Sequence, residues 1–192
     1  MEELQLAYTD YSLIVPLVLF AVYLWRRRES IKHPGRLVSS TVLAFSITLA
    51  LSLWNPVKTP YGGIGFTDVG VMAVAMVFGP AIGGFAGSLG PALGASLTGG
   101  PVSVVLLARG LEGLLTGYVA RNTEGSSGRI LAGVLGGALA VTIFVGFAYA
   151  SGAENPDAVL STMLAEVSTG IILGTGISGI IKRKVPWTED VL

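Results

Sequence analysis

Residues 69–108 contain no Asp, Glu, Lys or Arg, and this uncharged run constrains the fold of the chain more than any other feature. Hydrophobic residues make up 52% of the sequence, and its 12 basic and 12 acidic residues gather between long apolar runs. A soluble amphipathic helix would instead alternate polar and apolar positions with a period of about 3.6 residues. The pattern therefore predicts a polytopic membrane protein, folded as an all-α helix bundle.

Apolar length and helix-breaking residues divide the chain into spans, since about 20 apolar residues cross the hydrocarbon layer. We expect seven spans, at roughly residues 9–26, 36–56, 66–79, 81–98, 102–121, 129–151 and 158–181. The break at Phe78-Gly79-Pro80 separates the third span from the fourth, because proline lacks an amide donor and disfavours helical geometry in the preceding residue. The acidic start of the chain argues against a removable signal peptide, so the first span is expected to remain in the membrane.

The positive-inside rule supports this division independently. With these spans, one side of the membrane receives most of the basic residues: Arg26, Arg27, Arg28, Lys32, Arg36, Arg121, Arg129, Lys182, Arg183 and Lys184. The other side receives several acidic residues and Lys58. We therefore expect the N-terminus outside the cell and the C-terminus in the cytoplasm.

Three charges lie inside apolar spans, and a charge at that depth costs about 2.5–3.5 kcal/mol even on lenient insertion scales. Arg109 and Glu112 are in the fifth span and Glu166 is in the last. At 1.5 Å per residue, all three lie about 10–15 Å below the outer surface, and the spacing of Arg109 and Glu112 places them on one helix face. The sequence predicts a polar pocket in the outer half of the bundle.

Each of these residues also has a purely structural interpretation. Arg109 could pair with Glu112 or Glu166 only to orient helices. If Arg109 is matched by Glu112, Glu166 is a surplus carboxylate that needs a proton, a donor or a cation. Asp68 opens the third span, where it could bind a ligand or cap free amides of the first turn. Further candidates at the outer mouth are Trp54, Asn55 and Tyr61, although aromatic residues are common at membrane interfaces in any case.

Small residues recur at intervals of four in two spans. The fourth span has one such ridge in Gly79, Gly83, Gly87, Pro91 and Ala95, and a second in Gly84, Ser88, Ala92 and Ser96. This spacing allows helices to approach closely. The second span has a shorter ridge, Ser40, Ala44 and Thr48, which could serve an internal contact or a partner protein.

The sequence lacks the residue patterns of several functional classes, namely metal sites, ATPases, enzymes and nucleic acid binding. It contains no cysteine, and its one histidine, His33, lies in a cytoplasmic loop, so we expect no metal site and no cofactor. No lysine follows a glycine, which removes the phosphate-binding loop of ATPases. No nucleophile with a positioned base accompanies the carboxylates, so an enzyme is not expected. The basic residues are explained by topology and do not indicate nucleic acid binding.

Three stretches resemble the substrate-binding S component of energy-coupling factor (ECF) transporters. They are Gly65-Phe66-Thr67-Asp68-Val69 through Phe78-Gly79-Pro80, then residues 83–90, then Arg109-Gly110-Leu111-Glu112-Gly113-Leu114-Leu115-Thr116-Gly117. The resemblance covers roughly residues 36–183. It implies a six-helix substrate-binding core there, preceded by an extra N-terminal helix and a basic loop in residues 1–35 and followed by a cytoplasmic tail in residues 184–192.

The resemblance also implies a function and partners. An S component in a prokaryotic cell membrane captures a vitamin or related micronutrient and relies on a transmembrane coupling subunit and two cytoplasmic ATPases. Arg109 would face the ligand, Asp68 would lie at the mouth, and the loops at residues 58–65 and 98–101 would act as outer gates. The docking ridge of the family has two alanines four apart, and Ser40, Ala44 and Thr48 stand in its place here.

The sequence therefore predicts a binding subunit for a small water-soluble vitamin or precursor. Arg109 would meet an anionic or carbonyl group, and Glu166, with Glu112 or Asp68, would accept hydrogen bonds or balance a cation. Two alternatives remain open. One is a self-sufficient small-solute carrier or channel, and the other is a structural membrane subunit whose charges only pair with one another.

Overall fold

The computed structural model describes residues 33–54, 56–59 and 62–184, together with the helical residues Val18, Ala21, Val22 and Trp25. The expected N-terminal helix at residues 9–26 lies almost wholly outside the described residues. The same holds for Asn55, Tyr61 and the tail from residue 185 onward.

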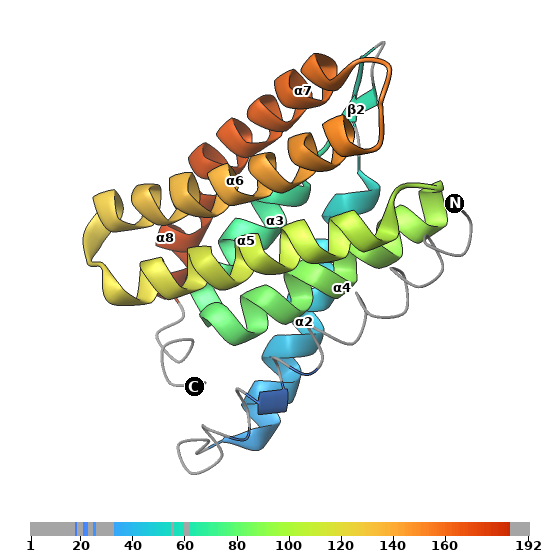
Figure 1. Ribbon diagram of the computed structural model, residues 1–192. Coiled ribbons are helices and arrows are strands. Elements are labelled where there is room, and N and C mark those ends of the chain that lie inside the picture. Colours follow the sequence, from blue (N-terminus) through green and yellow to red (C-terminus); the bar gives the residue numbers. More distant parts are fainter. Residues whose placement is uncertain are drawn as a thin grey trace.

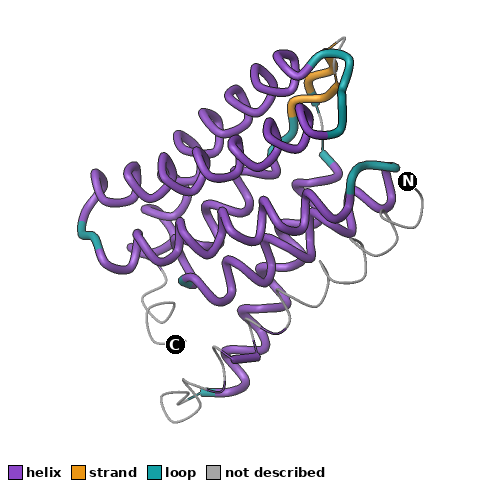
Figure 2. The backbone as a smooth tube through the Cα atoms, viewed as in Figure 1, coloured by secondary structure: helices purple, strands orange, loops and turns teal. Residues whose placement is uncertain are grey.

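The described chain is a bundle of helices with one short β-hairpin, which confirms the predicted all-α class (Figures 1 and 2). The elements are α2 Pro34–Leu53, β1 Val57–Thr59, β2 Gly62–Ile64, α3 Thr67–Phe78, α4 Pro80–Thr98, α5 Val102–Asn122, α6 Gly125–Ala150, α7 Pro156–Thr169, the π-helical segment η2 Gly170–Gly174, and α8 Thr175–Lys184. Helices α2 to α6 begin and end within a few residues of the expected spans, and the run from α7 to α8 covers the last one. Among α2 to α6 the largest difference is at α6, which starts at Gly125 because a helix can extend beyond the membrane boundary marked by its charges.

The break between α3 and α4 occurs at the predicted Gly-Pro pair. Gly79 has a φ of 87°, a region that favours glycine, and it ends α3 while preceding α4. Pro80 is the first residue of α4, where its missing amide costs no helical hydrogen bond. The two residues therefore turn what would be one overlong helix into two shorter ones.

The last span differs from the expected uninterrupted helix because α7 passes into α8 through η2. Two glycines of this segment pack closely on α3: a Cβ atom on Gly170 would lie 2.7 Å from the Asp68 Cβ, and one on Gly174 would lie 3.2 Å from the Met72 Cβ. A π-turn changes the rotational setting of the residues on either side of it. This segment thus helps to set which face of α7 is turned towards α3.

The hairpin lies where the sequence suggested only a loop. Strands β1 and β2 are antiparallel, with Val57 opposite Ile64 and Thr59 opposite Gly62. Figure 1 shows β2 beside the loop that joins α6 to α7, and β2 contacts α7. We call this end of the bundle the hairpin end. The opposite end, where Arg121, Arg129, Lys182 and Arg183 gather around one cavity, is the basic end.

Close backbone contacts hold α4 between α3 and α5. A Cβ atom on Gly83 would lie 2.6 Å from the Ala75 Cα, and one on Gly87 would lie 2.9 Å from the Arg109 carbonyl oxygen. Gly113 of α5 lies against the Gly83 carbonyl group. The small-residue ridges of α4 therefore form helix contacts within this chain.

The ridge on α2 makes internal contacts, one of the two roles that its spacing allowed. Ser40, Ala44 and Thr48 are all buried. The Thr48 hydroxyl group donates a hydrogen bond of 2.8 Å to the Ala86 carbonyl oxygen on α4, and Ala44 packs with Ile82 and Ala86. Ala44 and Thr48 thus contact α4, and docking of a partner on this ridge stays a prediction.

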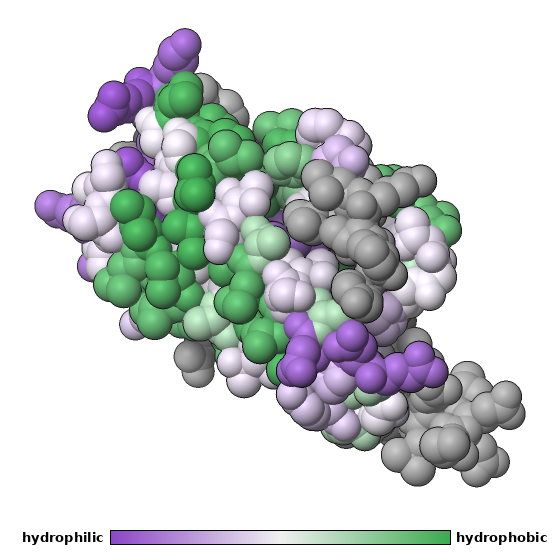
Figure 3. Space-filling view, turned by 90° about the horizontal axis from the view of Figure 1, so that it is seen from above, coloured by the Kyte–Doolittle hydropathy of each residue, from purple (hydrophilic) through white to green (hydrophobic). Residues whose placement is uncertain are grey.

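The outer surface is apolar, as expected for a protein in a bilayer. Pro34–Leu53, Val102–Asn122, Gly125–Ala150 and the run Pro156–Lys184 are each long and apolar enough to cross a membrane, and Thr67–Phe78 is a shorter apolar helix. Large hydrophobic side chains such as Val38, Val134 and Ile172 are exposed. Figure 3 shows hydrophobic residues over much of the visible face. A solvent-exposed surface of this kind would be unfavourable in water, whereas lipid covers it without cost.

Candidate functional site

Three helices bring four charged side chains together in the half of the bundle nearer the hairpin. Asp68 is in the first turn of α3, Arg109 and Glu112 are on α5, and Glu166 is on α7. Arg109 and Glu112 are three residues apart and so share one face of α5. We call these four residues the Arg109 cluster.

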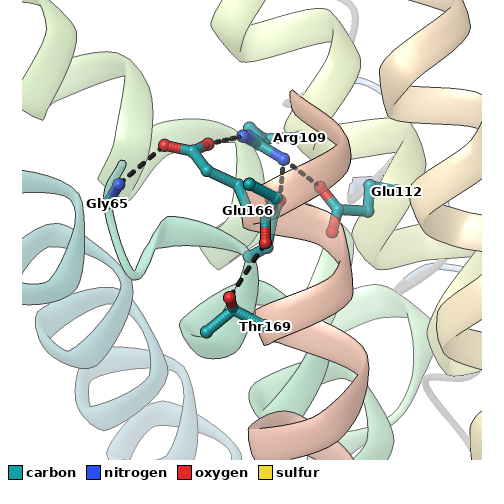
Figure 4. A network of polar contacts seen from close by, with 7 residues as sticks. Gly65, Arg109, Glu112, Glu166 and Thr169 are labelled. Carbon is teal, nitrogen blue, oxygen red and sulfur yellow. Dashed lines mark hydrogen bonds and ion pairs between the residues drawn. The ribbon is translucent and has the colours of Figure 1, made fainter. Parts of the chain in front are cut away.

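The Arg109 guanidinium lies at the centre of the cluster (Figure 4). Its Nη1 atom pairs with Asp68 Oδ1 and donates a hydrogen bond of 2.8 Å to Glu112 Oε2. Its Nη2 atom donates one of 3.0 Å to Glu166 Oε2. The expected meeting of charges from separate spans at one depth is therefore present, and Asp68 joins the three charges predicted to share that layer.

The Arg109 cluster is buried and contains more carboxyl groups than cations. Asp68 and Glu112 have no exposed surface, Arg109 is 3% exposed and Glu166 is 6% exposed. One guanidinium faces three carboxyl groups, so full ionisation would leave a net charge of −2 inside the bundle. Asp68 Oδ2 and Glu112 Oε1 also have no hydrogen-bond partner among the described residues. A buried polar network that is only partly satisfied is costly, and protons, a cation or hydrogen-bond donors would relieve that cost.

Asp68 pairs with arginine and does not cap its own helix. Phe66 is the N-cap residue of α3, and no side chain there accepts a capping hydrogen bond. The Asp68 carboxyl group instead points towards Arg109 on α5. Asp68 therefore makes no capping hydrogen bond, and its role in binding a ligand stays a prediction.

Glu166 connects the cluster to the hairpin. Its Oε1 atom accepts a hydrogen bond of 2.8 Å from the backbone amide of Gly65, the residue that follows β2 (Figure 4). Gly65 is itself buried. This role of Gly65 is not visible in the sequence, because a contact made by a backbone amide leaves no side-chain signal.

An aromatic pair lies next to this connection. The rings of Trp54 and Phe66 stack, with centroids 4.8 Å apart and an angle of 21° between the planes. Trp54 is 56% exposed, so one member of the pair is accessible at the hairpin end. The sequence indicated Trp54 as a candidate binding residue, whereas for Phe66 it indicated only membership of a family motif.

Phe144 is a further neighbour that the sequence did not indicate. The Arg109 guanidinium carbon lies 5.0 Å from the centroid of the Phe144 ring on α6, within the range of a cation–π interaction. A lone phenylalanine in an apolar helix carries no sign of such a role. The contact brings α6 into the surroundings of Arg109.

The cluster is closed around its own arginine. Within the part of the chain that the structure describes, no group of three His, Cys, Asp or Glu residues is arranged to hold a metal ion. The carboxyl groups converge on the guanidinium instead. A bound molecule would have to enter beside Arg109 and replace some of these contacts.

Comparison with known proteins agrees with this architecture. Residues 36–183 match the sequence profile of the family described as the ECF-type riboflavin transporter, S component. A protein from Pyrococcus woesei, whose printed name assigns no function, is 37% identical over 134 residues, which cover 68% of this chain and 89% of that protein. No solved structure matches the chain.

Proposed function

The chain belongs to the S components of ECF-type transporters, and from this premise we propose that it captures a small water-soluble vitamin or vitamin precursor outside the cell. An S component is a multi-pass membrane subunit that binds substrate for such a transporter. In our proposal the Arg109 cluster is the binding site. A transmembrane coupling subunit and two cytoplasmic ATPases would supply the energy for import.

The observation that carries this proposal is the unbalanced charge of the Arg109 cluster. A structural ion pair is most stable when its charges cancel and its lone pairs are satisfied. Here three carboxyl groups surround one guanidinium, and two of their oxygen atoms, Asp68 Oδ2 and Glu112 Oε1, have neither a hydrogen bond nor an ion pair among the described residues. These features support a site whose hydrogen-bond donors arrive with a ligand.

The ligand chemistry follows from the acceptors and from the aromatic pair. Carboxylate oxygens of Asp68, Glu112 and Glu166 favour a molecule rich in hydroxyl or N–H groups, and Arg109 favours a carbonyl or anionic group. The exposed ring of Trp54 offers a stacking surface for a planar group. Riboflavin, which the name of the matching family specifies, has a planar ring system with carbonyl and N–H groups and a polyhydroxyl chain. It is therefore the first ligand to test.

The direction of capture depends on orientation, which we propose from the positive-inside rule. Arg121, Arg129 and the run from Lys182 to Lys184 lie at the end opposite the hairpin, and such clusters favour the cytoplasm. The hairpin end would then face the outside, with the N-terminus outside and the C-terminus in the cytoplasm. In this orientation the Arg109 cluster lies nearer the outer face, and a solute from the medium would reach it by displacing contacts at the hairpin end.

The Gly65–Glu166 hydrogen bond is the proposed gate of this site. It ties the chain after β2 to a carboxylate that also holds Arg109. A ligand that donates to Glu166 would compete with the Gly65 amide for the same carboxylate. Entry of the ligand would therefore be coupled to movement of the hairpin.

Direct binding by the purified full chain tests the proposal. Mass spectrometry of small molecules released from the protein, followed by titration with riboflavin and monitoring of flavin fluorescence, should reveal a ligand bound with one-to-one stoichiometry. Glu166→Gln should weaken this binding by about tenfold or more, because it removes a charged acceptor. Glu154→Gln makes the same chemical change at an exposed position of the hairpin end and should leave affinity unchanged.

Two results would contradict the proposal, and each would favour one alternative function. If no small molecule other than lipid is recovered, and Glu166→Gln alters stability without any binding to lose, the cluster serves only to orient helices. If the isolated chain in liposomes concentrates a solute without ATPases, the protein is a self-sufficient carrier.

A further inference from the structure

A cavity of about 630 Å³ lies at the basic end, far from the Arg109 cluster. It is bounded by the ends of α3, α5 and α8 and by the start of α6. Arg121 and Arg109 are both on α5, and the residues between them separate the two sites by about 18 Å at 1.5 Å per residue. The cavity is therefore distinct from the proposed vitamin site.

The lining of this cavity is strongly basic. It includes Arg121, Arg129, Lys182 and Arg183, against one acidic residue, Glu124. Apolar residues at the end of α3, Met76, Val77 and Phe78, form another part of the wall. Like charges around one cavity repel one another, so an anion in the cavity would stabilise them.

Two glycines allow the arginine side chains to lie over the cavity walls. A Cβ atom on Gly179 of α8 would lie 3.2 Å from Arg129 Nη2, and one on Gly79 would lie 3.9 Å from Arg121 Nη1. Both glycines line the cavity themselves. The positive-inside rule explains why this end carries basic residues, but it does not require two of the guanidinium groups to lie beside glycines of the cavity wall.

At least one hydrogen-bond donor in the lining of this cavity has no acceptor among the described residues. Arg129 Nη2 donates a bond of 3.3 Å to Ser126 Oγ, while the Arg129 Nε atom is buried and has no partner among the described residues. Helix α6 begins at Gly125, and its N-cap residue Glu124 makes no side-chain capping hydrogen bond. The start of a long helix offers amide donors and a positive dipole end to an anion.

We propose that this cavity binds a phosphate group. Guanidinium groups, helix amides and hydroxyl groups are the donors that phosphate oxygens prefer, and the fork of an arginine fits them in a bidentate manner. The phosphate could belong to the headgroup of an anionic lipid, because basic pockets between membrane helices on the cytoplasmic side bind such headgroups and this cavity has an apolar wall. It could also belong to a soluble phosphate ester.

Lipid retention by the purified full chain distinguishes these sources. Native mass spectrometry in neutral detergent would compare phosphatidylglycerol with phosphatidylcholine of the same acyl chains, and calorimetric titration would add inorganic phosphate. We expect the wild-type chain to prefer phosphatidylglycerol by about tenfold, and Arg129→Gln to abolish that preference. Arg36→Gln removes a basic charge from the start of α2, outside the cavity lining, and should preserve it.

A second pair of variants keeps every charge in place. Gly179→Ala places a methyl group 3.2 Å from Arg129 Nη2, so this guanidinium must shift by a few tenths of an ångström and the preference for phosphatidylglycerol should weaken measurably. Gly176→Ala lies on the same helix with nothing within 4 Å of the added methyl group and should have no effect. This comparison remains informative if Arg129→Gln does not fold.

These measurements distinguish a lipid headgroup site, a site for a soluble phosphate and the absence of a site. Selective loss of phosphatidylglycerol in the Arg129 and Gly179 variants identifies a lipid headgroup site. Saturable binding of inorganic phosphate that Arg129→Gln abolishes, with no lipid preference, identifies a site for a soluble phosphate. No preference for either probe, or equal loss in Arg36→Gln, overturns the proposal. Riboflavin binding plays no part in this readout, so the two proposals can fail independently.

Discussion

The two ends of the bundle differ in the sign of their excess charged groups and in the burial of those groups. At the hairpin end, three carboxyl groups pair with one arginine, and none of the four residues is more than 6% exposed. At the basic end, four cationic residues and one acidic residue line a cavity of about 630 Å³. One end is closed and has an excess of carboxyl groups, whereas the other contains open space and has an excess of positive charge.

The difference shows that similar residue types have different physical costs at different depths. Charges within the bundle must satisfy one another or a ligand, because no water solvates them there. Charges at the membrane surface can be solvated by water or by lipid headgroups and need not pair within the protein. Variants at the hairpin end should therefore change stability strongly, and variants at the basic end should change it little.

The largest effect is expected from Arg109→Gln. This change leaves three carboxyl groups buried without their cation, and breaking a buried ion pair by removing one partner costs about 3–5 kcal/mol. The free energy of unfolding, measured by titration with a denaturing detergent, should fall by that amount, or the chain should fail to fold. A loss below about 1 kcal/mol would mean that the cluster contributes little to the fold.

The next effect concerns α5, the helix that connects the two ends. In Gly113→Ala, the added methyl group would collide with the Gly83 carbonyl oxygen on α4, and overpacking of this kind costs about 1–3 kcal/mol. Gly146→Ala on α6 meets nothing within 4 Å and should be neutral or slightly stabilising. Equal stability of the two variants would contradict the close α4–α5 contact on which the position of Arg109 depends.

A smaller effect of opposite sign is expected from Glu112→Gln. The amide keeps an oxygen acceptor for Arg109 and removes one negative charge from an over-acidic cluster, so the free energy of unfolding should rise by up to about 1 kcal/mol. The measurement should be made without added ligand. A fall of about 2 kcal/mol or more would indicate that the cluster needs all three ionised carboxylates.

The smallest effect is expected at the basic end. Arg183 is exposed, and Arg183→Gln should change the free energy of unfolding by no more than about 0.5 kcal/mol in neutral detergent. Measured beside Arg109→Gln, this variant tests the contrast directly. Comparable destabilisation by the two changes would remove the distinction between the ends.

Much of the helical framework could be predicted because its signals are local. Gly79 and Pro80 end one helix and begin the next through their own backbone preferences. Arg109 and Glu112 could be placed on one face by spacing alone, and Glu166 could be placed at the same depth by orientation and helical rise. Their mutual contact then required only that the helices be adjacent.

Other parts of the site left little trace in the sequence. The Gly65 amide that binds Glu166 and the Phe144 ring near Arg109 carry no distinctive side-chain pattern. The π-helical turn at Gly170–Gly174 depends on close packing against α3. Ser40, Ala44 and Thr48 had the spacing of a contact ridge, but spacing does not reveal whether the contact is internal or with another protein.

The sequence by itself determined where most of the helices run and that they belong in a membrane. These properties depend on the transfer free energy of each residue between water and lipid, which is nearly independent of distant neighbours. The tertiary structure decided which groups meet: Asp68 with Arg109, Gly65 with Glu166, and two arginines over a cavity. Such contacts depend on the rotation of each helix about its axis, and close packing between glycines and residues far away in the chain sets that rotation.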